Sequence, residues 1–137
     1  MVSEKVVGEI DNGLVILLGV QKGDTEKDAN FLVNKISGLR IFSDENDKMN
    51  LSIKDVNGSA LVISQFTLCG DTKKGRRPSF IKAATPDDGN RLYEYFMSEM
   101  KKGGVPIESG EFGAMMKIDA LNDGPVTLII DSREKKF

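Results

Sequence analysis

The sequence lacks histidine and tryptophan, and it contains one cysteine among 137 residues. A single cysteine, Cys69, excludes a disulfide within the chain and, with no secretory signal visible, predicts a reducing, cytoplasmic location. Because histidine and cysteine are the usual zinc ligands, we expect no metal site and no other cofactor. No apolar run approaches the ~20 residues of a membrane span, so we expect no membrane partner.

The charge of the chain is nearly balanced, with 19 basic and 21 acidic residues. A net charge of −2 provides no general attraction to nucleic acid. The basic residues nevertheless gather at one place, where Lys73, Lys74, Arg76 and Arg77 fall within five positions. Such a loop can bind a phosphate backbone locally, although charge alone equally fits a solvated turn.

Periodic apolar residues predict two helices and several strands in one domain covering residues 1–137. The helices are expected over residues 25–38 and 85–102, with Asp24 or Thr25 capping the first and Thr85 the second. Asn12-Gly13 predicts a hairpin turn before an apolar strand. The expected strands cover residues 14–20, 49–53, 61–69, 105–110, 114–121 and 125–132. This pattern indicates an α+β domain whose two helices pack on a mainly antiparallel sheet.

Two stretches carry candidate functional residues. In "LVISQFTLCG", the hydrogen-bonding side chains of Ser64, Gln65 and Thr67 interrupt an apolar strand, and an extended chain would place the last two on one face. A partly solvated strand face is the simpler explanation. In "NDGPVT", Gly124 and Pro125 stand at the entrance of an apolar strand, where a plain turn explains them equally well.

Taken together, "SQFTL", "DTKKGRRPSF" and "NDGPVT" closely resemble, in order and spacing, the D-aminoacyl-tRNA deacylase (D-tyrosyl-tRNA deacylase) family. The stretches "GLVILLGVQKGDTEKDA" and "LRIFSDENDKMNLS" are similar to the same family, so the resemblance covers nearly the whole chain. It implies an enzyme that hydrolyses the ester of D-aminoacyl-tRNA and releases the D-amino acid and tRNA. Whether glycyl esters mischarged on tRNA(Ala) are also cleaved stays open.

The resemblance also implies a homodimer with the active site at the subunit interface. Ser64, Gln65, Phe66 and Thr67 would line the catalytic pocket for the 3′-terminal adenosine and the ester carbonyl. The basic loop would bind tRNA. Since no histidine is present to activate a threonine hydroxyl, we predict that Thr67 positions the substrate while the ribose 2′-hydroxyl and a water carry the chemistry.

In the same family, a Gly-cisPro motif selects the chirality of the substrate. Gly124 and Pro125 match that motif, which enters the pocket of the partner subunit, holds the α-ammonium and leaves no room for an L side chain. We therefore predict a cis peptide bond between these two residues.

One departure and two rival readings accompany the resemblance. The family usually opens with a strand of the type Met-Arg-apolar-Gln-Arg-Val, which this sequence lacks together with its arginine, because Met1-Val2-Ser3 aligns with the middle of the first hairpin. The rivals are a non-catalytic tRNA-binding module and a structural dimer. No DNA partner is expected.

Overall fold

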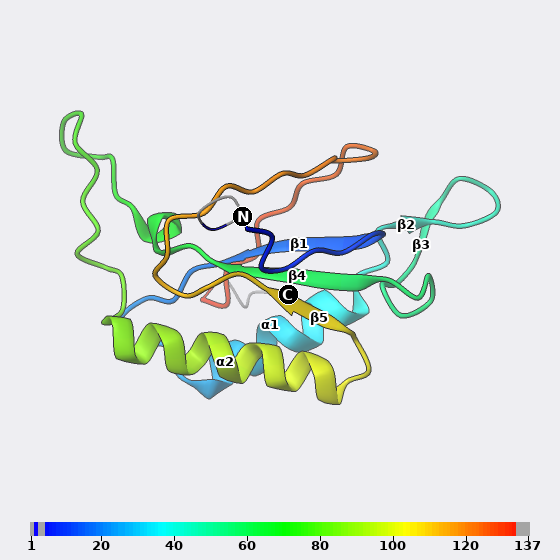
Figure 1. The fold of residues 1–137 in the computed structure, drawn as a ribbon, viewed down its shortest axis with the longest axis horizontal. Coiled ribbons are helices and arrows are strands. Elements are labelled where there is room, and N and C mark those ends of the chain that lie inside the picture. The colour runs from blue at the N-terminus through cyan, green and yellow to red at the C-terminus, as the bar shows by residue number, and fades with distance from the viewer. Residues whose placement is uncertain (1, 3–4, 134–137) are drawn as a thin grey trace.

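The computed structural model describes residue 2 and residues 5–133 of the chain. At its centre lies a sheet of β1 (Gly13–Leu18), β4 (Ser59–Ser64) and β5 (Ile107–Ser109), in the order β1-β4-β5. Figure 1 shows the helices α1 (Glu26–Gly38) and α2 (Pro86–Lys102) together on one side of this sheet. The two predicted helices are thus confirmed.

The central sheet is parallel, so the prediction of a mainly antiparallel sheet is wrong. β1 pairs with β4 and β4 pairs with β5, both in parallel. The physical reason is the connection: one helix follows β1 and the other follows β4 before the next strand of the sheet begins. Such a crossover returns the chain to the same end of the sheet, whereas a tight turn would reverse it. Antiparallel pairing is confined to β2 (Phe42–Ser43) and β3 (Met49–Leu51) among the named strands.

The hairpin predicted at Asn12-Gly13 is also wrong, since residues 6–12 form no strand. Gly13 instead begins β1 with a φ of +152°, and a Cβ atom there would lie 1.7 Å from the Ser59 carbonyl oxygen. The glycine is therefore required by the close approach of β1 to β4 rather than by a turn. Met1 and Ser3, on which the prediction about the first hairpin partly falls, lie outside the described residues.

Both helices begin at the predicted threonines. Thr25 is the N-cap of α1 and forms a capping box, in which its backbone N–H donates to Asp28 Oδ2 at 2.9 Å. Thr85 caps α2, its Oγ1 accepting from the Asp88 N–H at 3.4 Å, and Pro86 occupies the first helical turn. A cap of this kind contributes about 1 kcal/mol. None of the described helices is both long and apolar enough to cross a membrane.

The core lies between the helices and the sheet. Its most deeply buried large side chains are Phe96 and Met100 from α2, Val62 from β4, and Ile53 and Val105 from connecting segments. Each such side chain contributes about 1.5–3 kcal/mol through its removal from water. This packing attaches α2 to β4, the strand that leads directly into the candidate site.

Residues 114–121 and 125–132 do not form the regular strands predicted for them. They carry apolar side chains that remain largely exposed, among them Met115 at 92%, Leu121 at 93% and Ile129 at 97%. Alternating apolar residues indicate an apolar face, but a strand also needs a neighbouring edge to accept and donate its backbone hydrogen bonds. In the described chain, neither segment pairs with an edge strand of the sheet.

Candidate functional site

The predicted strand over residues 61–69 ends early. β4 stops at Ser64, and residues Phe66–Cys69 form a short 3₁₀ helix, η1. β1, the neighbour of β4, ends at Leu18, whose carbonyl accepts the Gln65 N–H at 2.8 Å. Beyond that bond no regular strand pairing continues among the described residues, and the chain coils into η1 instead.

The polar side chains of this stretch meet across the turn of η1 rather than along a strand face. Gln65 Nε2 donates a hydrogen bond to Thr67 Oγ1 at 2.5 Å. Phe66 is 58% exposed and packs its ring edge-to-face with Phe80, at 5.1 Å between centroids. Phe80 was not identified by the sequence analysis, although it belongs to the "GRRPSF" motif. Ser64 is half-buried at the end of β4.

The start of η1 presents backbone donors. The first N–H groups of a helix have no acceptor within that helix, and in η1 these belong to Phe66 and Thr67. Two such donors side by side can stabilise a developing oxyanion. Below them η1 is closely packed on the end of β1, because a Cβ atom at Gly19 would lie 3.0 Å from Leu68 Cβ.

Cys69, the last residue of η1, serves packing rather than chemistry. Its Sγ donates to the Val20 carbonyl oxygen at 3.5 Å, and the side chain is buried. Burial raises the pKa of the Cys69 thiol, which keeps the group protonated at neutral pH. A protonated, buried thiol is neither a nucleophile nor a metal ligand. Among the described residues, no group of three or more acidic, cysteine or histidine side chains could hold a metal ion.

The basic loop projects beside η1, as the green loop at the left of Figure 1 shows. Asp71 and Ser79 close its base with two backbone hydrogen bonds of 2.7 and 2.9 Å. The Asp71 carboxylate accepts the Lys73 N–H at 2.9 Å, and this bond lowers the pKa of Asp71. The four basic side chains of the loop are exposed: Lys73, Lys74, Arg76 and Arg77.

The "NDGPVT" motif forms an internally bonded turn. Asn122 Nδ2 donates to Thr127 Oγ1 at 2.9 Å, and Asn122 Oδ1 accepts the Val126 N–H at 3.2 Å. The peptide bond between Gly124 and Pro125 is cis, which confirms the prediction. Gly124 has a φ of +151°, a value that favours glycine.

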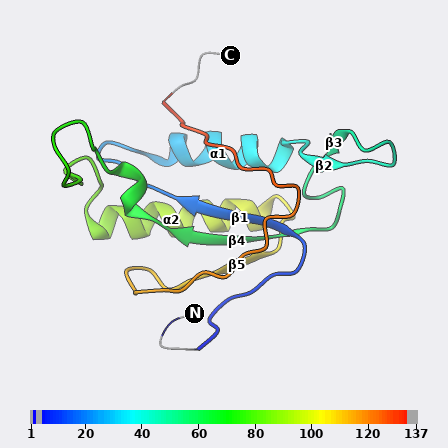
Figure 2. The ribbon, with the colours of Figure 1, turned by 90° about the horizontal axis from the view of Figure 1, so that it is seen from above.

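One chain does not bring this turn to η1. In Figures 1 and 2 the orange-to-red segment bends on the right-hand side of the molecule, whereas η1 lies on the left. A cavity of about 860 Å³ is lined by β1, α1, the C-terminal segment and, from η1, Leu68 and Cys69. Neither the four predicted catalytic residues nor Gly124 and Pro125 line it. Within one subunit, the predicted catalytic residues and the predicted chirality-selecting residues are therefore separate groups.

Comparison with known proteins shows the family to which this chain is similar. The family model described as D-Tyr-tRNA(Tyr) deacylase matches residues 1–131. A D-aminoacyl-tRNA deacylase of Thermotoga petrophila is 54% identical over 132 residues, covering 96% of this chain and 89% of the relative. One from Bacillus cereus (strain G9842) is also 54% identical, covering 96% of this chain and 90% of the relative.

A solved structure supports the fold over nearly the same extent. The c-Myc DNA unwinding element binding protein is similar with a TM-score of 0.88 and 36% identity, covering 93% of this chain and 87% of that one. The overall fold described above is thus a known one. With the family model spanning both "SQFTL" and "NDGPVT", the chain belongs to the D-Tyr-tRNA(Tyr) deacylase family.

Proposed function

We propose that this protein hydrolyses the ester bond of D-aminoacyl-tRNA and so removes D-amino acids from mischarged tRNA. The observation that carries this proposal is the family match over residues 1–131, with relatives at 54% identity that are D-aminoacyl-tRNA deacylases. The local geometry agrees with it, since backbone donors at the start of η1 lie beside an exposed basic loop. Charged tRNA is a cytoplasmic substrate, which fits the single reduced cysteine.

The proposed reaction is ester hydrolysis at the carbonyl carbon of the aminoacyl group. A water oxygen adds to this carbon, and the N–H groups of Phe66 and Thr67 stabilise the oxyanion that forms. The bond between the carbonyl carbon and the ribose oxygen then breaks. One proton of the water passes to the ribose oxygen, the other is released to solvent, and the amino acid leaves as a carboxylate. In this scheme the terminal 2′-hydroxyl assists the water, and Thr67 orients the substrate through its hydroxyl.

Chiral selection is assigned to Gly124 and Pro125 of the partner subunit in a homodimer. Two observations support this assignment. The turn lies far from η1 within one chain, so a second copy is the natural source of the motif. The chain also exposes apolar side chains on β1 and on residues 114–131, such as Leu17 and Ile129, and a large exposed apolar surface is typical of an interface.

The exposed basic loop is assigned to the tRNA backbone. Lys73, Lys74, Arg76 and Arg77 lie on one projecting segment. The chain that follows this loop is joined to the segment after β1, because the Lys22 N–H donates to the Lys82 carbonyl oxygen at 2.9 Å. Phosphates bound there would direct the 3′ end of the tRNA towards η1.

The decisive experiment compares matched D- and L-aminoacyl-tRNA and measures the free amino acid released. We expect rapid release from the D ester and none above the spontaneous rate from the L ester. Binding of both tRNAs without release would instead favour the non-catalytic tRNA-binding module. A third reaction with glycyl-tRNA(Ala) determines whether an achiral ester is also a substrate.

A further inference from the structure

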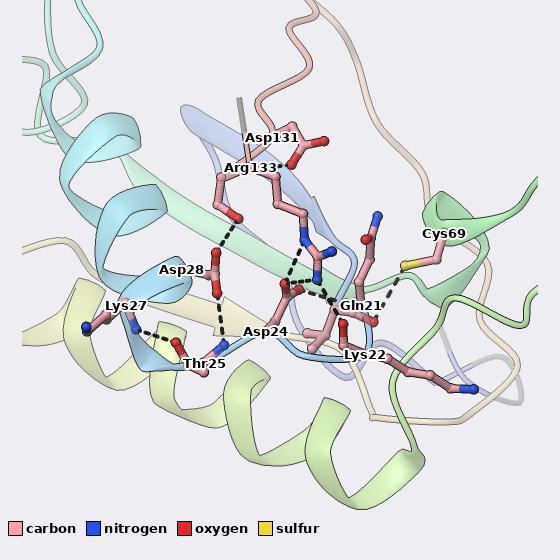
Figure 3. A network of polar contacts seen from close by, with 11 residues as sticks. Gln21, Lys22, Asp24, Thr25, Lys27, Asp28, Cys69, Asp131 and Arg133 are labelled. Carbon is pink, nitrogen blue, oxygen red and sulfur yellow. Dashed lines mark hydrogen bonds and ion pairs between the residues drawn. The ribbon is translucent and has the colours of Figure 1, made fainter. Parts of the chain in front are cut away.

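The end of the described chain is bonded to the turn that precedes α1, as Figure 3 shows. Arg133 Nη2 donates to Asp24 Oδ1 and to the Lys22 carbonyl oxygen, each at 2.8 Å, while Nε donates to the same Asp24 oxygen at 3.3 Å. Next to it, Ser132 Oγ donates to Asp28 Oδ1 at 2.9 Å. The sequence analysis did not identify Arg133, because Asp24 lies 109 positions earlier in the chain.

The Asp24 carboxylate also closes its own turn. Its Oδ2 accepts the Gln21 N–H at 2.7 Å, and the Asp24 N–H donates back to the Gln21 carbonyl at 3.1 Å. The Asp24 side chain is only 12% exposed. Water therefore solvates its carboxylate less than a surface carboxylate, and the hydrogen-bond partners stabilise more of its negative charge. Charge-assisted bonds of this kind are about twice as strong as neutral ones, so Arg133 holds the turn firmly.

The segment that leads from β1 to Asp24 also contacts η1. Leu18 accepts the Gln65 N–H at 2.8 Å, and Val20 accepts the Cys69 thiol at 3.5 Å. Gly19, between them, is packed so closely that a Cβ atom would lie 3.4 Å from the Gln65 carbonyl oxygen. Residues 18–24 therefore connect η1 with the Arg133–Asp24 ion pair.

We infer that Arg133, through its ion pair with Asp24, is a positioning residue that keeps η1 in the orientation required for oxyanion binding. Arg133 bonds to Asp24 and to Lys22, and Asp24 fixes the segment on which Gln65 and Cys69 are supported. The catalytic consequence rests on the proposed function, whereas the structural consequence for η1 does not.

The first test is kinetic and uses a matched control pair. Arg91 of α2 bonds to Glu26, the first residue of α1, and its side chain is 51% exposed, against 48% for Arg133. The contacts of Arg91, however, do not lead to η1. In single-turnover reactions with saturating enzyme, Arg133→Gln should lower the rate about tenfold without changing the half-saturating enzyme concentration, since small misplacements slow reactions more than binding. Arg133→Lys should recover part of the rate, and Arg91→Gln should match wild type.

The second test does not depend on activity. The amides of Gln65, Leu68 and Gly70 donate to Leu18, Gln65 and Thr67, so their hydrogen exchange reports the order of η1. We expect faster exchange at these amides in Arg133→Gln and unchanged exchange in Arg91→Gln. Unchanged exchange in Arg133→Gln overturns the inference. If the wild type releases no amino acid, the proposed function fails, but the hydrogen-exchange result still decides the inference. If Arg133→Gln does not fold, Arg133→Lys is used in its place.

Discussion

At the scale of single residues, the Thr67 hydroxyl is the most direct candidate for a nucleophile, yet its surroundings do not activate it. The partner that the structure gives it is the Gln65 amide, whose Nε2 donates to Thr67 Oγ1 at 2.5 Å. An amide does not take up a proton at neutral pH, and the chain has no histidine. The geometry therefore agrees with the expectation that Thr67 orients the substrate.

We predict that Thr67→Ala keeps substantial turnover. Loss of one hydrogen bond of about 0.5–1.5 kcal/mol should slow D-aminoacyl-tRNA hydrolysis by about tenfold at most. A substrate whose terminal ribose lacks the 2′-hydroxyl should be nearly inert with wild type. Both rates are measured as released amino acid in single-turnover reactions. A trapped acyl-Thr67 adduct, or a normal rate on the 2′-deoxy substrate, would contradict this assignment.

The backbone N–H of Phe66 can be removed without removing the helix, because proline is tolerated at the first helical position. We predict that Phe66→Pro lowers kcat by about 10²–10³-fold, the cost of one oxyanion donor in a well-studied protease. Phe66→Leu serves as the control, because it keeps the N–H and removes only the ring that contacts Phe80. Equal losses in the two variants would assign the effect to the ring instead.

At the scale of elements, η1 and the basic loop have separate roles in the proposal. η1 is a short helix supported from below by the end of β1, whereas the loop projects into solvent from the base formed by Asp71 and Ser79. Because η1 is packed on the end of β1, it can hold reacting groups in a fixed position. An exposed loop of cations suits contact with a mobile phosphate backbone, which binds through charge more than through fixed geometry.

This division predicts a selective effect of charge removal. Lys73→Ala combined with Arg76→Ala should raise KM for D-aminoacyl-tRNA and leave kcat largely intact. The slope of log affinity against log salt concentration should become shallower by about 1.4–1.8, the value for two lost phosphate contacts. The control is Lys101→Ala combined with Lys102→Ala, which also removes two positive charges, but at the C-terminal end of α2. A collapse of kcat at saturating substrate would show that the loop does more than bind tRNA.

At the scale of the whole molecule, the proposal requires each active site to use two subunits. This can be tested by complementation between two inactive variants. Phe66→Pro removes a proposed oxyanion donor from η1. Gly124→Ala places a side chain at a φ of +151° with its Cβ 3.2 Å from the Val126 N, at a strain of about 1–3 kcal/mol.

Mixed dimers of the two variants should recover activity. One of their two sites would combine an intact η1 with an intact Gly124 turn, so co-refolded protein should regain up to about a quarter of the wild-type rate if subunits pair at random. Each variant refolded alone should stay inactive. If the co-refolded mixture also stays inactive, η1 and the Gly124 turn of one chain belong to the same site, which contradicts the proposal.

Local chemistry made the helices predictable. The threonine caps at Thr25 and Thr85 and the apolar face of α2 depend on residues a few positions apart, so the sequence was sufficient for them. The same holds for the motifs: "SQFTL" and "NDGPVT" led to the family that the comparisons show.

Sequence by itself determined the two helices with their caps, the family and the residues proposed for the site. The tertiary structure decided the direction of the strands, the end of β4 at Ser64 and the contact of Arg133 with Asp24. Each of these depends on which distant segment supplies the hydrogen-bond partner, and no local pattern carries that information. β4 becomes η1 where β1 ends, and the Asp24 turn is held by a residue 109 positions away.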